Sequence, residues 1–426
     1  MKQSGVEWIG KIPEDWKVYR NKNAFICNKE IVGKNSNSTQ LLSLTTGGIK
    51  CKDINNAEGK LPESFDTYQY VKKNDVVMCL FDLDMSAVFS GISQYDGMIS
   101  PAYKVLSCQD RANPLFVHYW FSYIFDGRKF NHYAKNIRYT LNYDEFATLP
   151  ILLPPKETQQ CIASYLDKKC NKIEETIQNQ QQVIEKLKAY KQSLITEAVT
   201  GKVKIANGKA CGEYESYKDS GVEWIGKIPS EWEVKKLKFS SQIMRGLFSH
   251  RPRNDPDYYD GVHPFIQTGE VARAVKYITT YSQTLNELGF SVSREFPAGT
   301  VLLTIAANVG DVAILDFNAC FPDSVIGFYP KENVSKIFMF YVLKSMKEQF
   351  MRNAIISTQM NLNINIVKEE FIPLPSLAEQ KEIVKFLEKK SDYIDTAIEQ
   401  KQNLIEKLTE YKKSLIYECV TGKKAV

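Results

Sequence analysis

The cysteine and histidine content of the chain excludes the common metal and disulfide frameworks. The nine cysteines are scattered, no two of them form a CxxC pair, and their number is odd. The four histidines form no HExxH or HxH group. Reduced thiols therefore explain the cysteines better than disulfides or a zinc site. We expect no metal site in this chain.

Long apolar runs are also missing. No run of 18 apolar residues occurs, and the first residues lack the apolar centre of a signal peptide. Because a membrane helix needs about 20 apolar residues, we expect no membrane segment and a cytoplasmic location. The 426 residues, 43% of them hydrophobic and 12% aromatic, fit a folded protein of two domains. The net charge of +5 allows a polyanionic partner but does not establish one.

Familiar catalytic motifs are missing as well. The sequence contains no GxGxxG, GxxxxGK[ST] or GxSxG motif. It also lacks the Asn/Asp-Pro-Pro-Tyr/Phe element of amino-methyltransferases, from which residues 254–257 (NDPD) differ at the positions that matter. Asp82 and Asp84 are the kind of acid pair found in metal-dependent nucleases, but we interpret them as solvated turn residues. No catalytic constellation therefore stands out in the sequence.

Two segments of the chain occur twice. Residues 184–202 (IEKLKAYKQSLITEAVTGK) return as residues 405–423 (IEKLTEYKKSLIYECVTGK), 221 positions later. Residues 4–16 (SGVEWIGKIPEDW) return as residues 220–232 (SGVEWIGKIPSEW), 216 positions later. A repeat of this length indicates a duplicated domain, because solenoid repeats are about 20 to 50 residues long. The chain therefore has two-fold internal symmetry.

The longer repeated segment ends a predicted long helix in each unit, the first at residues 156–200. Apolar residues recur in a 4-3 pattern over several heptads, which is typical of a coiled-coil seam. At about 1.5 Å per residue, a helix of some 43 residues spans roughly 65 Å and therefore needs a partner. The predicted seam residues are Ile173, Ile177, Ile184, Leu187 and Leu194 in the first helix and Ile394, Ile398, Ile405, Leu408 and Leu415 in the second.

Two-fold symmetry predicts that the two helices run antiparallel and hold two variable domains apart. The polar seam residues Gln180 and Lys401 would weaken the packing and help to fix its register. The alternative is that both helices simply cover globular cores. Proline residues just before each helix and a glycine just after it, at Gly201 and Gly422, mark the helix boundaries.

The predicted fold class is α+β: two pseudo-symmetric mixed α/β domains joined by two long antiparallel coiled-coil helices. The variable domains should contain strands at 75–81, 102–106, 299–305 and 311–315, with helices at 114–130 and 334–351. We expect the repeated tryptophan segments to pack on a neighbouring domain or helix end. The predicted domains are a joint segment (1–16), a first variable domain (17–155), a long helix (156–202), a linker with the second joint segment (203–232), a second variable domain (233–376) and a second long helix (377–426).

Loops rich in basic, amide and hydroxyl side chains distinguish the two variable domains. Arg and Lys make bidentate contacts with guanine, and Asn and Gln make them with adenine. As a set, these residues suit base reading combined with phosphate contacts. The candidates are Lys34, Asn35, Thr45, Thr46, Lys50, Arg138, Tyr139 and Asn142 in the first domain, and Arg245, His250, Arg251, Arg253, Asn308, Arg352, Gln359, Asn361 and Asn363 in the second.

The order of the repeated segments resembles that of the specificity subunit of type I restriction-modification systems. Each unit carries an EWIGxIPxxW segment (7–16 and 223–232), a variable domain, a proline-marked helix start (153–159 and 374–380) and a long helix that ends in VTGK (185–202 and 406–423). The resemblance covers the whole chain. It departs slightly where Ser376 replaces Pro155, and where the pattern of Gln159 and Gln160 is shifted by about one residue against Glu379 and Gln380.

The resemblance implies a function and a set of partners. Each variable domain would be a target recognition domain that reads one half of a split, asymmetric DNA sequence, and the helix pair would set the distance between the halves. Two modification subunits, which hold the S-adenosylmethionine site, would dock on the helices and joint segments. Restriction subunits, which use ATP and Mg, would join that complex, while this chain itself would bind no cofactor. The alternatives are the recognition part of a fused methyltransferase-nuclease and a coiled-coil scaffold with no nucleic-acid role.

Overall fold

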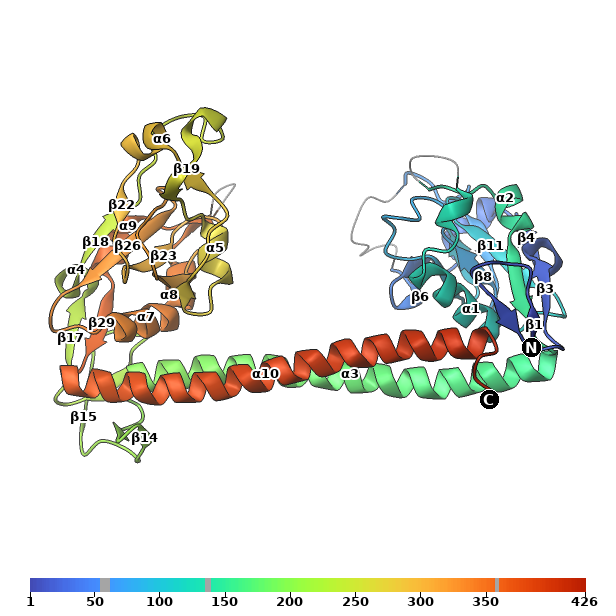
Figure 1. Ribbon diagram of the computed structural model, residues 1–426. Coiled ribbons are helices and arrows are strands. Elements are labelled where there is room, and N and C mark those ends of the chain that lie inside the picture. Colours follow the sequence, from blue (N-terminus) through green and yellow to red (C-terminus); the bar gives the residue numbers. More distant parts are fainter. Residues whose placement is uncertain (54–61, 135–138, 357–359) are drawn as a thin grey trace. The chain divides into compact units, whose positions relative to one another are not determined.

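The computed structural model describes residues 1–53, 62–134, 139–356 and 360–426. Contacts divide the chain into two compact units. Unit 1 contains residues 1–181 and 401–426, and unit 2 contains residues 182–400. Two helices of 44 residues each, α3 (Lys156–Val199) and α10 (Leu377–Val420), contribute to both units (Figure 1). Mixed helices and strands in both units, together with these long helices, confirm the predicted α+β class.

Unit 1 contains a four-stranded antiparallel sheet with the strand order β4-β11-β8-β9. Two-stranded ribbons surround it, and β12 pairs with β3 so that the two ends of the variable domain meet. The strands are β1 (Lys2–Gln3), β2 (Lys11–Ile12), β3 (Lys17–Arg20), β4 (Phe25–Asn28), β5 (Leu42–Thr45), β6 (Gly48–Cys51), β7 (Gln69–Val71), β8 (Val76–Met78), β9 (Ser90–Ile92), β10 (Gly97–Ile99), β11 (Lys104–Cys108) and β12 (Pro150–Leu153). The helices are η1 (Asn21–Asn23), η2 (Gly33–Ser38), α1 (Pro114–Asp126), η3 (Asn131–Tyr133) and α2 (Tyr143–Thr148).

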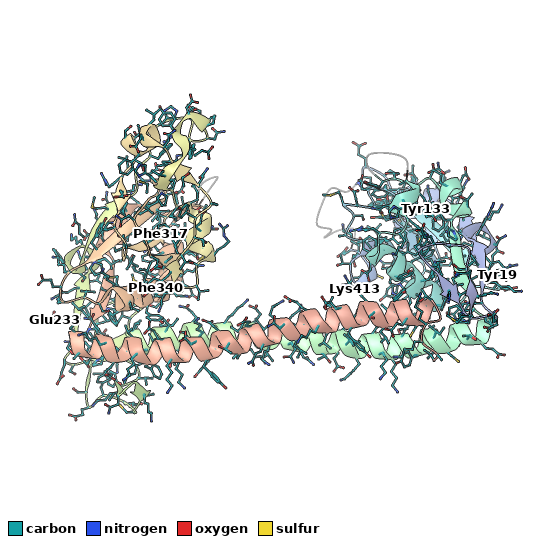
Figure 2. All side chains as sticks on the ribbon, viewed as in Figure 1. Tyr19, Tyr133, Glu233, Phe317, Phe340 and Lys413 are labelled. Carbon is teal, nitrogen blue, oxygen red and sulfur yellow. The ribbon has the colours of Figure 1, made fainter. Side chains whose placement is uncertain are left out.

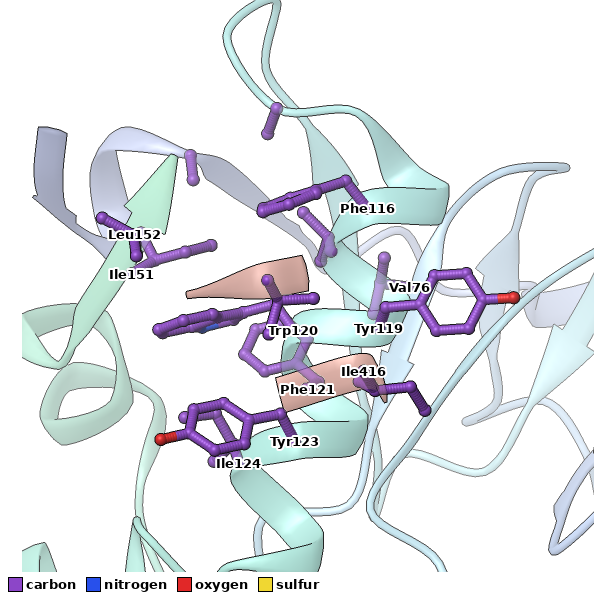
Figure 3. Packing of buried hydrophobic residues seen from close by; sticks show 14 of the residues in the cluster. Val76, Phe116, Tyr119, Trp120, Phe121, Tyr123, Ile124, Ile151, Leu152 and Ile416 are labelled. Carbon is purple, nitrogen blue, oxygen red and sulfur yellow. The ribbon is translucent and has the colours of Figure 1, made fainter. Parts of the chain in front are cut away.

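The aromatic helix α1 forms the centre of the unit 1 core. The Asn113 side chain caps its first turn by accepting hydrogen bonds from two backbone N–H groups, and proline follows at the first helical position. Trp120 and Phe121 are fully buried and pack with Ile416 of α10 in one apolar cluster (Figure 3). Such aromatic side chains bury roughly 150–250 Å² each and dominate the packing energy of a core. The predicted helix 114–130 is shorter than expected, because it ends at Asp126 and Gly127 caps its last turn.

Unit 2 contains a five-stranded sheet with the order β18-β26-β23-β24-β20, in which only the β20–β24 pair is parallel. Its main strands are β17 (Glu233–Lys236), β18 (Ser241–Arg245), β19 (Tyr259–Pro264), β20 (Tyr277–Ile278), β21 (Thr284–Leu285), β22 (Glu295–Phe296), β23 (Val301–Thr304), β24 (Val312–Leu315), β25 (Ala319–Cys320), β26 (Val325–Pro330), β27 (Ile355–Ile356), β28 (Met360–Asn361) and β29 (Phe371–Leu374). Its helices, apart from its share of α3 and α10, are α4 (Leu237–Ser240), η4 (Pro256–Tyr258), α5 (Thr268–Arg273), α6 (Glu287–Ser291), α7 (Lys336–Ser345), α8 (Lys347–Arg352) and α9 (Ile364–Glu369).

One expectation for unit 2 is wrong in detail, and another leaves out structure that is present. The single helix expected at 334–351 is two helices, α7 and α8, separated at Met346, whose ψ of 4° leaves the helical range. Met346 is itself buried, so the apolar pattern continues through the break and conceals it. The segment expected as a plain linker contains the hairpin β13 (Ile205–Ala206) and β14 (Lys209–Ala210), followed by β15 (Tyr217–Asp219) paired with β16 (Lys227–Pro229). Gly208 in that hairpin donates a backbone hydrogen bond to Glu382 of α10 over 2.7 Å.

The joint segments pack on helix ends, as expected, and each contact uses a glycine. In unit 1 the N-terminal segment packs on the end of α10, where a Cβ added to Gly422 would lie 2.5 Å from Pro13. In unit 2 a Cβ added to Gly201, just past α3, would lie 2.4 Å from Pro229. Both glycines have a positive φ, +70° and +72°, which a Cβ disfavours. The first joint segment therefore belongs with the last helix of the chain.

A buried glutamine in the first turn of α3 ties three parts of unit 1 together. Gln159 is 1% exposed. Its side-chain oxygen accepts the backbone N–H of Asn113, the cap of α1, over 2.8 Å. Its amide nitrogen donates to the carbonyl oxygens of Arg111 and Pro154, each over 2.8 Å. All the strong hydrogen-bonding groups of this buried amide are therefore engaged, which a buried polar group requires.

Gln380 ties the equivalent three parts of unit 2 together. Its oxygen accepts the backbone N–H of Ser335, the cap of α7, over 2.8 Å. Its nitrogen donates to Asn333 and Pro375 over 3.0 and 2.9 Å. Gln159 and Gln380 are 221 positions apart, the offset of the repeat itself. The displacement of about one residue expected between the two helix starts is therefore wrong.

The long helices are antiparallel within each unit. In unit 1, Lys412 of α10 forms an ion pair with Glu174, and Lys401 donates to the Gln180 side chain over 3.1 Å. Residue numbers therefore fall along α10 as they rise along α3. In unit 2, Lys191 of α3 forms an ion pair with Asp395 of α10 over 2.6 Å.

All ten predicted seam residues are buried or partly buried. Those below 9% exposure are Ile173, Ile184, Ile394, Ile405 and Leu415, and those partly buried are Ile177, Leu187, Leu194, Ile398 and Leu408. None of the helices in the described ranges has both the length and the apolar character needed to cross a membrane.

Candidate nucleic-acid interface

The β5–β6 hairpin presents three of the candidate residues in unit 1. Its turn is closed by Thr45, whose hydroxyl donates to the Gly48 carbonyl over 2.8 Å and accepts the Gly47 N–H over 3.2 Å. Gly48 has a φ of +88°, which a tight turn of this kind needs. Thr45 is thus occupied in shaping the turn. Thr46 and Lys50 are exposed beside it and are free to face a ligand.

The other unit 1 candidates divide between exposed side chains and structural ones. Lys34 and Asn35 are exposed on η2, where the Asn35 amide donates to the Tyr70 hydroxyl over 3.0 Å. Tyr139 is 38% exposed and has a φ of +47°. The Asn142 side chain caps α2 in a capping box with a glutamate, so its oxygen is already used. Arg138 lies outside the described residues.

Arginine candidates in unit 2 converge on one carboxylate that the sequence did not single out. The Arg251 and Arg253 guanidinium groups both contact the side chain of Asp323, and Arg245 donates to its backbone carbonyl. Asp323 lies 70 or more positions further along the chain, so spacing in the sequence gives no signal for this cluster. Only the packing of the segment after β18 against the segment before β26 brings these groups together.

His250 stands beside this cluster in a fixed orientation. Its ring nitrogen Nε2 lies 2.9 Å from the Asp255 carboxylate, and the ring stacks on Tyr258 at a centroid distance of 3.8 Å. A histidine held from two sides contributes mainly to the shape of the loop.

Two of the remaining unit 2 candidates, Asn308 and Asn361, lie at or beside one turn. Asn308 is exposed in the turn that joins β23 to β24, and a β-bridge between Ala306 and Asn361 brings β28 beside that turn. The Asn363 side chain caps α9 by accepting an N–H over 2.9 Å. Arg352 is exposed at the end of α8. Gln359 lies outside the described residues.

A cavity in each unit opens where the variable domain meets the long helices. The unit 1 cavity has a volume of about 590 Å³ and is lined by the β5–β6 turn, by α1, and by the helix residues Glu174 and Lys412. Lys413, labelled in Figure 2, is another lining residue and lies 3.9 Å from Asp126 of α1. Polar and apolar groups share the lining, so the cavity has no single ligand chemistry.

The unit 2 cavity is the counterpart of the first, with a volume of about 290 Å³. Lys191 and Asp395 line it, and they stand 221 positions from Lys412 and Glu174 respectively. Burial, together with the neighbouring Lys191 ammonium, lowers the pKa of Lys344 in this cavity to about 8. The repeat offset therefore makes the two ion pairs equivalent. Among the described residues, no group of three or more His, Cys, Asp and Glu side chains is placed to hold a metal ion.

Part of this chain is similar in sequence to DNA-specificity subunits of type I restriction enzymes. Residues 229–408 match the family described as "Type I restriction modification DNA specificity domain". The putative type I restriction enzyme MjaX specificity subunit of Methanocaldococcus jannaschii is 25% identical over 405 residues, covering 91% of this chain and 89% of the relative. The MjaIX specificity subunit of the same organism is 32% identical over 180 residues, covering 41% of this chain and 40% of the relative. The EcoBI specificity subunit of Escherichia coli is 25% identical over 57% of this chain and 52% of the relative.

Solved structures have the same fold. A chain from a study of complex assembly and conformational transition in the type I R-M system superposes with a TM-score of 0.73 at 15% identity, covering 97% of this chain and all of the other. The HsdS subunit from Thermoanaerobacter tengcongensis superposes with a TM-score of 0.51 at 16% identity, covering the full length of both chains.

Proposed function

We infer what the two variable domains do from the family to which this chain belongs, the DNA-specificity subunits of type I restriction-modification systems. The chain supplies sequence specificity and no catalysis of its own. In our proposal, the described parts of residues 17–155 and 233–376 are two target recognition domains, each of which reads one half of a bipartite, asymmetric DNA target. The observation that carries this proposal is the contrast between a repeated frame and two different surfaces.

The repeated frame has the same hydrogen bonds in both units. Gln159 and Gln380 hold equivalent helix caps, and Gly201 and Gly422 receive equivalent joint segments. The surfaces that the frame carries differ in chemistry. Unit 1 presents a hairpin with a threonine and a lysine, whereas unit 2 presents arginines gathered on Asp323. Different side chains on equivalent supports suit the reading of two different half-sites.

We propose that the α3–α10 pair sets the distance between half-sites and carries the partner subunits. Two modification subunits, which bind S-adenosylmethionine, would dock on the helices and joint segments and place one active site at each half-site. Each would extract an adenine from the duplex and methylate it, while this chain holds the DNA. Restriction subunits that use ATP and Mg would join the same complex. The chain itself would hold no cofactor.

DNA retention by the assembled complex tests this function against a scaffold with no nucleic-acid role. Mapping methylated adenines in the source genome identifies the target duplex. The complex is expected to retain this duplex at least 1,000-fold more tightly than a duplex with both half-sites scrambled, the lower end of specific recognition. If the complex contacts six or more phosphates, raising the salt from 50 to 200 mM should also weaken its binding to DNA by roughly 10³-fold or more.

The control is the complex with residues 17–155 replaced by the same region of an unrelated specificity subunit. That complex should assemble but should lose its preference for the original duplex. Equal retention of target and scrambled duplexes by the unaltered complex would contradict the proposed function and favour the scaffold. Methyl transfer by this chain without partner subunits would favour the fused enzyme.

A further inference from the structure

The segment after β18 is built to lie directly against the segment before β26. Gly246 makes this approach possible, because a Cβ at this position would lie 2.3 Å from the Pro322 carbonyl oxygen and 2.4 Å from that of Phe321. Phe248, only 2% exposed, then anchors the segment in an apolar cluster with Phe265. The backbone that carries the arginines is therefore fixed before any ligand binds.

Asp323 receives guanidinium groups from two residues of this segment. Arg251 Nη2 lies 3.4 Å from one carboxylate oxygen, and Arg253 Nη2 donates to the other. Arg245 Nε donates to the Asp323 backbone carbonyl over 2.5 Å. Three positive groups thus meet one negative group, and the Asp323 side chain remains 31% exposed. The cluster keeps a net positive charge on the surface of unit 2.

The two arginines on the carboxylate are not equivalent. Arg251 Nη1 donates to the carbonyl oxygens of Phe248 and His250 over 2.6 and 2.7 Å, so with the Asp323 contact three of its five N–H groups are used. Arg253 donates side-chain hydrogen bonds only to Asp323 among the described residues, which leaves most of its planar donor edge free. Arg251 therefore holds the loop, and Arg253 presents donors.

We propose that Asp323 is a specificity-determining positioning residue that aims the free donor edge of Arg253 at a guanine in the second half-site. The inference rests on the proposed function and names a residue through which unit 2 reads its bases. Bidentate reading of guanine O6 and N7 needs a guanidinium of fixed orientation, whereas a phosphate contact needs only a nearby charge. A carboxylate that holds two guanidinium groups provides that orientation.

Asp323→Asn in the assembled complex tests this role. The loss of the Asp323 charge and the loss of the Arg253 orientation predict opposite changes in DNA affinity. Removing a negative charge near DNA should by itself tighten binding to every duplex. Loss of orientation should instead weaken binding to the target by on the order of 10- to 100-fold, and should relax the preference for guanine at one position of the second half-site. Asp257→Asn is the matched control, since Asp257 is an exposed carboxylate in the neighbouring η4 that contacts neither Arg251 nor Arg253.

Arg253→Lys gives a second test that keeps the positive charge and leaves the Asp323 carboxylate in place. It should relax the same guanine position while the melting temperature of the complex stays within about 2 °C of the unaltered one. Unchanged affinity and base preference in either variant would overturn the proposal. Equal weakening on target and scrambled duplexes would also overturn it, because that result indicates a phosphate contact or a damaged fold. If the unaltered complex does not prefer its target, the proposed function itself is contradicted. This outcome is distinct from a failure of the Asp323 proposal, which concerns only the variants.

Discussion

Removing one heptad from each long helix is expected to shorten the gap between the methylated half-sites by roughly two to three base pairs. Seven residues of α-helix span about 10.5 Å, and base pairs are about 3.4 Å apart along the duplex. Residues 178–184 and 399–405 are the suitable heptads, because they are 221 positions apart and lie far from the joint segments. Deleting seven residues keeps the remaining seam residues in phase. The bases read in each half should not change.

The measurement is the map of methylated adenines in cells that carry the shortened chain with its partner subunits. A chain in which the same two heptads are substituted at exposed positions, without deletion, serves as the control and should keep the original gap. Deleting the heptad from α3 alone should abolish methylation, because the antiparallel ion pairs Lys412–Glu174 and Lys191–Asp395 can no longer both form. An unchanged gap in the chain with both helices shortened would show that the helices do not set the distance between half-sites.

Gly422→Ala is expected to destabilise unit 1 by about 2–4 kcal/mol. About 1 kcal/mol comes from placing a Cβ at a left-handed φ of +70°. A further ~1–3 kcal/mol comes from forcing that Cβ into Pro13, 2.5 Å away. Calorimetry of the chain should show a fall of roughly 5–15 °C in the melting temperature of unit 1, given about 2–4 °C per kcal/mol for a unit of this size.

Gly10→Ala is the matched control, because Gly10 also has a positive φ, +72°, but no atom lies within 4 Å of an added Cβ. This variant should lose only about 1 kcal/mol. Gly201→Ala should reproduce the larger effect in unit 2, where Pro229 lies 2.4 Å from the added Cβ. If the Gly422→Ala and Gly10→Ala variants have the same melting temperature, the N-terminal segment does not pack on the end of α10.

The repeated parts of the frame are well predicted by the sequence. Two closely similar segments 221 positions apart, together with 4-3 apolar spacing, indicate two paired helices, and local signals such as Gly422 mark their ends. The apolar spacing and the helix ends depend on residues close together in the chain, and the repeat is read directly by comparing the two segments. The break at Met346 is not predicted, because a buried apolar residue continues the helical pattern through it. Tertiary packing, rather than local preference, ends α7.

The candidate interface is predicted less well, and the asparagines show the reason. Asn142 and Asn363 look like base-reading side chains in the sequence, but both cap helices through their side-chain oxygens. A cap and a base contact need the same residue type, and only the backbone conformation distinguishes them. Asp323 was missed for the opposite reason. Nothing near it in the sequence reveals that Arg251 and Arg253 fold onto it.

The central claim is that two dissimilar domains read two half-sites independently on one repeated frame. Exchange of residues 17–155 for the equivalent region of another specificity subunit, followed by mapping of methylated adenines, tests it most directly. We expect one half of the methylated sequence to change, while the other half and the gap stay the same. A change in both halves, or in neither, would contradict it.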